Sequence, residues 1–147
     1  MLWHFLLSLA VDATTASAAH IAQRPAEAVR PYVEAAWIAG PRVGVDPLLL
    51  VAVGLVESNL SPVRGDGGRA CGPWQYHPTY SPAREALGWD GVCAMLMNDP
   101  LEAAMHAAER LAAYPDVCHY QAGHTCRHTR YSLRVEARLA RLRRGTR

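Results

Sequence analysis

The chain has 147 residues, half of them apolar and 19% charged, which is typical of one globular domain and excludes a disordered chain. All fifteen basic residues are Arg, and the net charge of +2 conceals an uneven distribution. Residues 127–147 hold eight Arg and one acid, about +7, whereas residues 1–126 hold seven Arg and twelve acids, about −5. The strongly basic part of the chain is therefore its C-terminal segment.

The first 24 residues form an apolar N-terminal segment with two open interpretations. Residues 2–11 have the length of a signal-peptide core, and residues 16–18 (Ala-Ser-Ala) resemble a cleavage site. No Arg or Lys precedes Arg24, however, so the segment can equally be a retained helix packed on the domain. No uninterrupted apolar run reaches the roughly 18–20 residues needed to cross a bilayer, and we therefore expect no transmembrane span.

Pro and Gly divide the rest of the chain into helical segments, and strand-like alternation persists nowhere. Asp46-Pro47 and Asp99-Pro100 are strong helix starts, because Asp caps free amides and Pro fits the first helical position. Residues 61–80, with four Gly and three Pro, are expected to be a loop. Helices are predicted over residues 25–39, 47–58, 81–88, 91–97, 101–114 and 132–144. The fold class predicted is all-α, a single domain of six or seven helices.

We divide the chain into an N-terminal segment (1–24), a main domain (25–126) and an Arg-rich C-terminal helix (127–147). In the last of these, Val135, Leu139 and Leu142 form one apolar stripe. Its basic face has two interpretations: a solvated surface, or contact by charge with an anionic wall polymer, lipid headgroups or nucleic acid. No recognised DNA- or RNA-binding motif accompanies the charge.

Four cysteines in a small chain indicate an oxidising compartment and disulfide bonds. We favour the pairs Cys71–Cys93 and Cys118–Cys126, because each pair brackets a loop. Zinc is the alternative for the second pair, because zinc-ligand residue types cluster around it. These residues are Cys118, His119, His124, Cys126 and His128. Their spacing fits no ligand pattern, so we expect neither a metal nor a cofactor.

Glu57 is the most informative single residue. It lies at the end of the most apolar predicted helix, with Leu50, Val53 and Gly54 at helical spacing on its face. A carboxylate there must be partnered, protonated or at the mouth of a cleft, because burying a bare charge costs several kcal/mol. Desolvation raises the pKa of a carboxyl group, as a general acid near neutral pH requires.

Three motifs follow in order around this acid. Residues 44–58 read GVDPLLLVAVGLVES, residues 71–78 read CGPWQYHP, and residues 119–123 read HYQAG. Together they resemble the lytic transglycosylases of the superfamily that also contains the goose-type lysozymes, over roughly residues 26–125. The family motifs are G-V-D-P-x-L-L-x-A-x-x-x-x-E-S, G-L-M-Q-x-x-P and A-Y-N-A-G. The chain departs from them at Pro73-Trp74, in place of Leu-Met, and at Gln121, in place of Asn.

The resemblance implies a lysozyme-like domain with a catalytic cleft that cleaves the β-1,4 bond between N-acetylmuramic acid and N-acetylglucosamine in peptidoglycan. It implies Glu57 as acid and then base, closing a 1,6-anhydro ring without water. Asp66 is the candidate assisting acid. Tyr120 is expected to orient Glu57, and Trp74 and Tyr76 to stack on sugar rings, although one of these two must face the core. The expected substrate-binding residues are Ser58, Trp74, Gln75, Tyr76, Tyr120 and Gln121.

Two other functions stay open on the same sequence. A hydrolytic muramidase would admit water, with Asp66 helping, and a catalytically weak wall-binding or structural component would keep the fold without turnover. The expected partners are peptidoglycan glycan strands, and phage-tail or secretion-machine proteins if the chain belongs to such an assembly. The expected location is the cell envelope, in the periplasm, outside the cell or on a virion.

Overall fold

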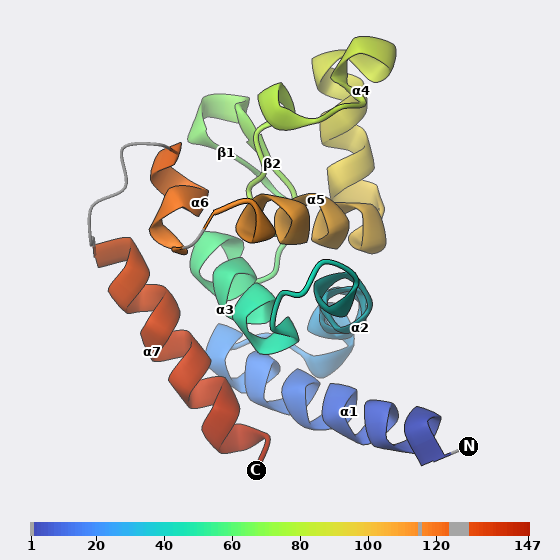
Figure 1. Cartoon of the computed structure of the whole chain (residues 1–147), viewed down its shortest axis with the longest axis vertical. Helices are drawn as coiled ribbons and strands as arrows, with labels where there is room; N and C mark the ends of the chain where they lie inside the picture. Colours follow the sequence, from blue (N-terminus) through green and yellow to red (C-terminus); the bar gives the residue numbers. More distant parts are fainter. Residues whose placement is uncertain (1, 115, 124–129) are drawn as a thin grey trace.

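The structure, a computed structural model, describes residues 2–114, 116–123 and 130–147. Within these residues the chain is mostly helical, with seven α-helices and one small antiparallel sheet (Figure 1). The prediction of an all-α fold is thus confirmed. The helices are α1 Leu2–Ala22, α2 Ala26–Arg42, α3 Pro47–Ser58, α4 Arg84–Asn98, α5 Pro100–Ala112, α6 Cys118–Ala122 and α7 Arg130–Gly145. The strands are β1 Arg64–Gly65 and β2 Ala70–Cys71, and two 3-10 turns cover Asp66–Gly68 and Pro78–Tyr80.

The two Asp-Pro signals account for the starts of α3 and α5. Asp46 caps α3 by accepting a hydrogen bond from the Leu48 amide at 2.9 Å, with Pro47 in the first position, as predicted. The two helices predicted over residues 81–88 and 91–97 are joined in α4, which is interrupted at Gly88 (φ 68°). Helix α6 was not predicted, because its five residues are too few to show a period.

Helix α3 forms the centre of the core. The six consecutive residues Leu50–Leu55 are all buried, because α2, α7 and α1 pack around the helix. At Gly54 a Cβ would lie 3.0 Å from Trp74 Nε1 and would overlap the Leu60 side chain, so only glycine admits both neighbours. Trp74 fills this space and donates a hydrogen bond from Nε1 to the Leu50 carbonyl at 2.8 Å.

The Arg-rich helix α7 packs along α3 and meets α1 near its C-terminal end (Figure 1). Tyr131, Val135 and Leu142 are buried and Leu139 is partly buried, so the predicted apolar stripe faces the core. The apolar side of this helix therefore belongs to the same core as residues 26–123. The predicted boundary between residues 126 and 127 lies outside the described residues.

Helix α1 bears on the expectation that the chain has no transmembrane span. Over His4–Ala22 it is long and apolar enough to cross a bilayer, judged by length and composition, with a mean hydropathy of 1.3. The expectation of no span counted only uninterrupted apolar residues, whereas this criterion averages hydropathy over the whole helix. A core helix or a signal sequence meets the same criterion of length and composition. In the fold, the C-terminal half of α1 is nevertheless part of the core, with Val11, Thr14, Ala18 and Ile21 buried.

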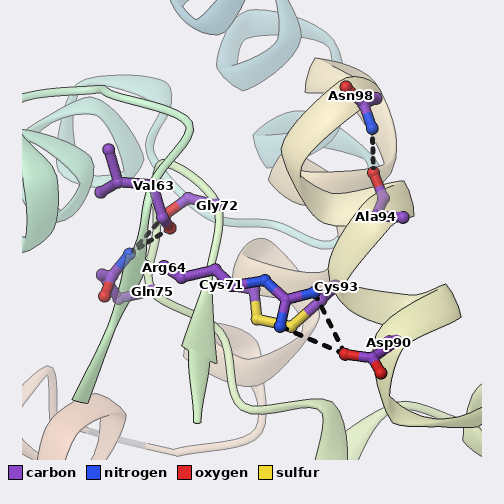
Figure 2. The surroundings of a disulfide bond; sticks show 9 residues. All are labelled: Val63, Arg64, Cys71, Gly72, Gln75, Asp90, Cys93, Ala94 and Asn98. Atoms are coloured by element: carbon purple, nitrogen blue, oxygen red, sulfur yellow. Dashed lines mark hydrogen bonds and ion pairs between the residues drawn. A yellow bond between two sulfur atoms is a disulfide. The ribbon is translucent and has the colours of Figure 1, made fainter. Parts of the chain in front are cut away.

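A disulfide bond joins Cys71 of β2 to Cys93 of α4, as predicted. Arg64 is the strand partner of Cys71, and its guanidinium is 3.2 Å from the Asp90 carboxylate, as Figure 2 shows. The bond and the ion pair fasten the loop of residues 61–80 to α4. Cys118 is also disulfide-bonded, and its expected partner Cys126 lies outside the described residues.

The alternative zinc site is only partly covered by the structure. Among residues 2–114, 116–123 and 130–147, no three His, Cys, Asp or Glu side chains are close enough to hold a metal ion. His124, Cys126 and His128 lie outside these ranges.

Replacing Asp99 by Ala is expected to lower the free energy of unfolding by about 1 kcal/mol, the usual cost of losing an N-cap. The Asp99 carboxylate accepts hydrogen bonds from the amides of Leu101 and Glu102 at 3.0 and 3.1 Å. Urea unfolding followed by circular dichroism measures this loss. The matched control is Asp90→Ala, which removes an exposed ion pair and should change stability by less than about 0.5 kcal/mol. Equal losses in both variants would contradict the capping role.

Candidate active site

Glu57 is placed by the end of α3. The helix is apolar through Val56, and Glu57 emerges beside the N-terminal part of α7. Burial raises the pKa of the Glu57 carboxyl, while a hydrogen bond from Tyr131 and the positive charge of Arg134 oppose this rise. The group is thereby held closer to its protonated form at neutral pH than an exposed glutamate.

Side chains from the three motifs meet in one pocket of about 370 Å³. Glu57 comes from the first motif, Gln75 from the second, and Tyr120 and Gln121 from the third. Asp66 lies in the same pocket. The full lining is Glu57, Asp66, Ala70, Gln75, His77, Tyr120 and Gln121. A volume of this size is within the range of about 300–1,000 Å³ that is common for small-molecule sites.

Tyr131 is the residue that holds Glu57, and the sequence did not indicate it. Its hydroxyl donates a hydrogen bond to Glu57 Oε1 at 2.6 Å. Burial and the nearby Glu57 charge raise the pKa of Tyr131, so its hydroxyl keeps its proton and remains a donor. The only signal in the sequence was an aromatic residue at the start of an Arg-rich helix, 74 positions from its partner.

The predicted orienting role of Tyr120 is not what the structure gives. Its hydroxyl donates to the Trp74 carbonyl at 2.8 Å and so fixes the second motif rather than Glu57. Tyr120 still lies near the acid, because the charge of Glu57 adds to burial in raising the Tyr120 pKa. The third motif therefore forms the pocket wall, while the hydrogen bond to the acid comes from α7.

The predicted sugar platforms need a correction. Trp74 is 1% exposed and packs in the core, so no face of its ring is open to a sugar. Tyr76 is also buried, and burial raises its pKa to about 12. Tyr76 does line a pocket of about 220 Å³ that shares Asp66, Gln75, His77, Tyr120 and Gln121 with the first. Of the two rings, only Tyr76 thus borders the site.

Ser58 is predicted to bind substrate but is used by the protein itself. Its Oγ donates to the Pro73 carbonyl at 2.6 Å and accepts from the Ser61 amide at 2.9 Å. Ser58 lines neither pocket. It therefore joins the end of α3 to the second motif.

Two pocket residues, Gln75 and Asp66, have an unusual backbone conformation. Their φ angles are 47° and 50°, in the left-handed region that side chains with a Cβ seldom adopt. Gln75 Nε2 donates to the carbonyls of Val63 and Gly72, each at 2.9 Å, as Figure 2 shows. Both hydrogen bonds of the Gln75 amide nitrogen thus hold the loop, and Oε1 is the atom of this side chain that is left to bind a ligand.

Compared with protein-family models, curated proteins and solved structures, the chain matches none. The features of the chain that indicate a function are the pocket and the three motifs that meet there.

Two further pocket residues had little or no signal in the sequence. His77 lines both pockets, with Nε2 3.5 Å from the Asp66 carboxylate. Arg110 of α5 lines the second pocket, with its guanidinium carbon 4.0 Å from the Tyr80 ring centre. Arg110 is therefore the cation available to an acidic group of a ligand in that part of the site.

Proposed function

We propose that the protein is a peptidoglycan lytic transglycosylase on a lysozyme-like domain, with Glu57 as acid and base. The observation that carries the proposal is the meeting of all three motifs in one pocket with a partly buried glutamate. A chance match of short motifs would have no reason to bring Glu57, Gln75 and Tyr120 to the same 370 Å³ space. The chemistry of the acid gives independent support, because burial raises its pKa.

The proposed reaction uses the two oxygens of Glu57 differently. Tyr131 donates to Oε1, while Oε2 accepts no hydrogen bond from the described residues. Oε2 then carries the proton that is given to the oxygen of the glycosidic bond as that bond breaks. The N-acetyl group of the sugar stabilises the anomeric carbon. The Glu57 carboxylate next takes the proton from the C6 hydroxyl, whose oxygen bonds to the anomeric carbon and closes the anhydro ring.

The test of this proposal is mass spectrometry of the fragments that the protein releases from purified peptidoglycan. Fragments lighter by one water than hydrolysed muropeptides are the expected result. Hydrated fragments would identify a muramidase instead. A folded protein that releases nothing from several wall types would be a binding or structural component.

Hydrolysis is the second candidate, because Asp66 lines the same pocket as Glu57. Most glycosidases use two carboxylates, one of which activates water or attacks the sugar. Asp66 is half-exposed and lies 3.6 Å from the Arg69 guanidinium and 3.5 Å from His77. Its surroundings are thus those of a solvated ion pair, whereas Glu57 is partly buried and bonded to Tyr131.

Asp66→Asn separates the two candidates. In a transglycosylase we expect the rate to change by no more than about fivefold, because an exposed ion pair contributes about 0–1 kcal/mol. The fragment masses should stay the same. If Asp66 activated water, the loss would instead be about 10²–10⁴-fold. Release of soluble fragments from labelled peptidoglycan measures both cases.

A further inference from the structure

A second hollow, larger than the Glu57 pocket, lies between α1 and α7. It has a volume of about 680 Å³ and is lined by His20, Arg24, Arg138 and Arg141 but by no acid. A smaller pocket of about 250 Å³ shares His20 and Arg141 and adds Arg144. We call these residues, His20, Arg24, Arg138, Arg141 and Arg144, the basic groove.

The charge of the basic groove is not balanced by acids. Within the part of the chain that the structure describes, Arg138, Arg141 and Arg144 form no ion pair, whereas Arg143 on the α3 side of the same helix lies 3.0 Å from Asp46. Arg24 is fixed by donating to the backbone carbonyls of Asn59 and Leu60. Guanidinium groups gathered in this way bind phosphate oxygens well, because their fork of donors matches that geometry.

The other end of α1 is apolar and uncovered. Phe5 is 62% exposed and Leu9 50% exposed, and Leu6 and Leu7 are exposed beside them. In Figure 1 the first turns of α1, in dark blue, extend beyond the other helices. Large apolar side chains gathered at one exposed end commonly mark a contact with a partner or a membrane.

The apolar end and the basic groove share one face of α1. Phe5, Leu9, Ala16 and His20 are all exposed, and their spacings of four, seven and four residues keep them on one side of a helix. The acid of α1 itself, Asp12, is exposed and is paired with Arg30 of α2 at 2.8 Å. A flat anionic layer against this face would therefore meet apolar side chains at one end and arginines at the other.

We propose that α1 and α7 dock the protein on the surface of an anionic phospholipid bilayer. Phe5 and Leu9 insert among the acyl chains, and the basic groove binds lipid phosphates, as interfacial helices with basic neighbours do. The C-terminal half of α1 stays in the core, so the helix lies on the membrane and does not cross it. Crossing would remove Val11, Ala18 and Ile21 from the core.

Lipid explains both parts of this surface, whereas nucleic acid explains only the charge. A phosphate backbone would engage the arginines but would leave Phe5 and Leu9 in water. Each large apolar side chain that leaves water and is fully buried strengthens binding by about tenfold or more. Only an occupant with both phosphate and hydrocarbon uses the whole face.

The test is co-sedimentation of the full chain with vesicles of phosphatidylcholine, with and without phosphatidylglycerol. We expect binding only where phosphatidylglycerol is present, decreasing as salt is added. Arg138→Gln/Arg141→Gln should weaken it about fivefold for each arginine, since a basic residue near such a surface contributes about 1 kcal/mol. Phe5→Ser/Leu9→Ser should weaken it about tenfold or more, and these exposed positions leave the core intact.

The matched control is Arg69→Gln/Arg84→Gln, which removes the same charge from the loop before β2 and from α4. This control should bind nearly as well as the wild type. An equal loss in the control, or equal binding to phosphatidylcholine alone, would overturn the proposal. Tighter binding to duplex DNA than to the mixed vesicles at the same salt would replace lipid by nucleic acid as the ligand.

Discussion

Replacing Glu57 by Gln is expected to reduce the release of muropeptides by about 10²–10⁴-fold, the usual contribution of a general acid and base. Glutamine keeps the shape of the side chain and still offers an oxygen to the Tyr131 hydroxyl, so the pocket should be preserved. It cannot give a proton to the leaving oxygen or take one from the C6 hydroxyl. Fragment release from labelled peptidoglycan, with mass spectrometry of the products, measures the loss.

Glu136→Gln is the matched control, because it makes the same change at an exposed position on α7 and should retain full activity. Circular dichroism shows whether both variants are folded. Full activity in a folded Glu57→Gln protein would mean that another group is the acid. A loss in both variants alike would mean that the assay reports charge rather than catalysis.

The same variant tests the pKa of Glu57 without any substrate. Because burial raises this pKa in the folded state, the stabilisation from the bound proton is fully present below the ordinary pKa of glutamate. It is lost as the pH rises through the raised value. Urea unfolding over this range should show wild type losing stability relative to Glu57→Gln. A constant difference between the two would contradict the raised pKa.

Local signals in the sequence predicted the local structure well. Asp46-Pro47 fixed the start of α3, and the first polar residues after Val56 marked its end at Ser58. Because α3 carries Glu57, the Asp46 cap and the apolar run that follows it were enough to predict that the candidate acid lies at the end of a buried helix. Helix α6 was missed because so short a helix is stabilised by its contacts with α5 and α7 rather than by its own pattern.

Orientation and long-range contact could not be predicted in the same way. Trp74 lies in a loop whose sequence has no period, so the sequence did not show which of Trp74 and Tyr76 faces the core. In the structure Trp74 is buried because its ring fills the space beside Gly54. Tyr131 was hidden by its distance along the chain from Glu57. The Arg-rich composition around Tyr131 suggested a solvated surface, although the opposite side of α7 packs on α3.

Tyr131→Phe is expected to lower kcat by about 10–100-fold while the protein stays folded. A hydrogen bond to a charged group contributes about 1.5–3 kcal/mol, and each 1.36 kcal/mol corresponds to a factor of ten in rate. The bond to Oε1 also lowers the Glu57 pKa, so its loss should raise that pKa further. The alkaline limb of the profile of kcat/KM against pH should then move to higher pH.

Tyr120→Phe provides the contrast, because its hydroxyl donates to the Trp74 carbonyl and not to Glu57. This variant should lose about 1–3 kcal/mol of stability, since it leaves a buried carbonyl without its donor. The alkaline limb should stay where it is in wild type. If the alkaline limb of the kcat/KM profile moved in Tyr120→Phe and not in Tyr131→Phe, Tyr120 of the third motif would be the residue that orients Glu57. A limb that moved in Tyr131→Phe alone would assign this role to α7, because a purely structural tyrosine changes stability without changing the pKa of the acid.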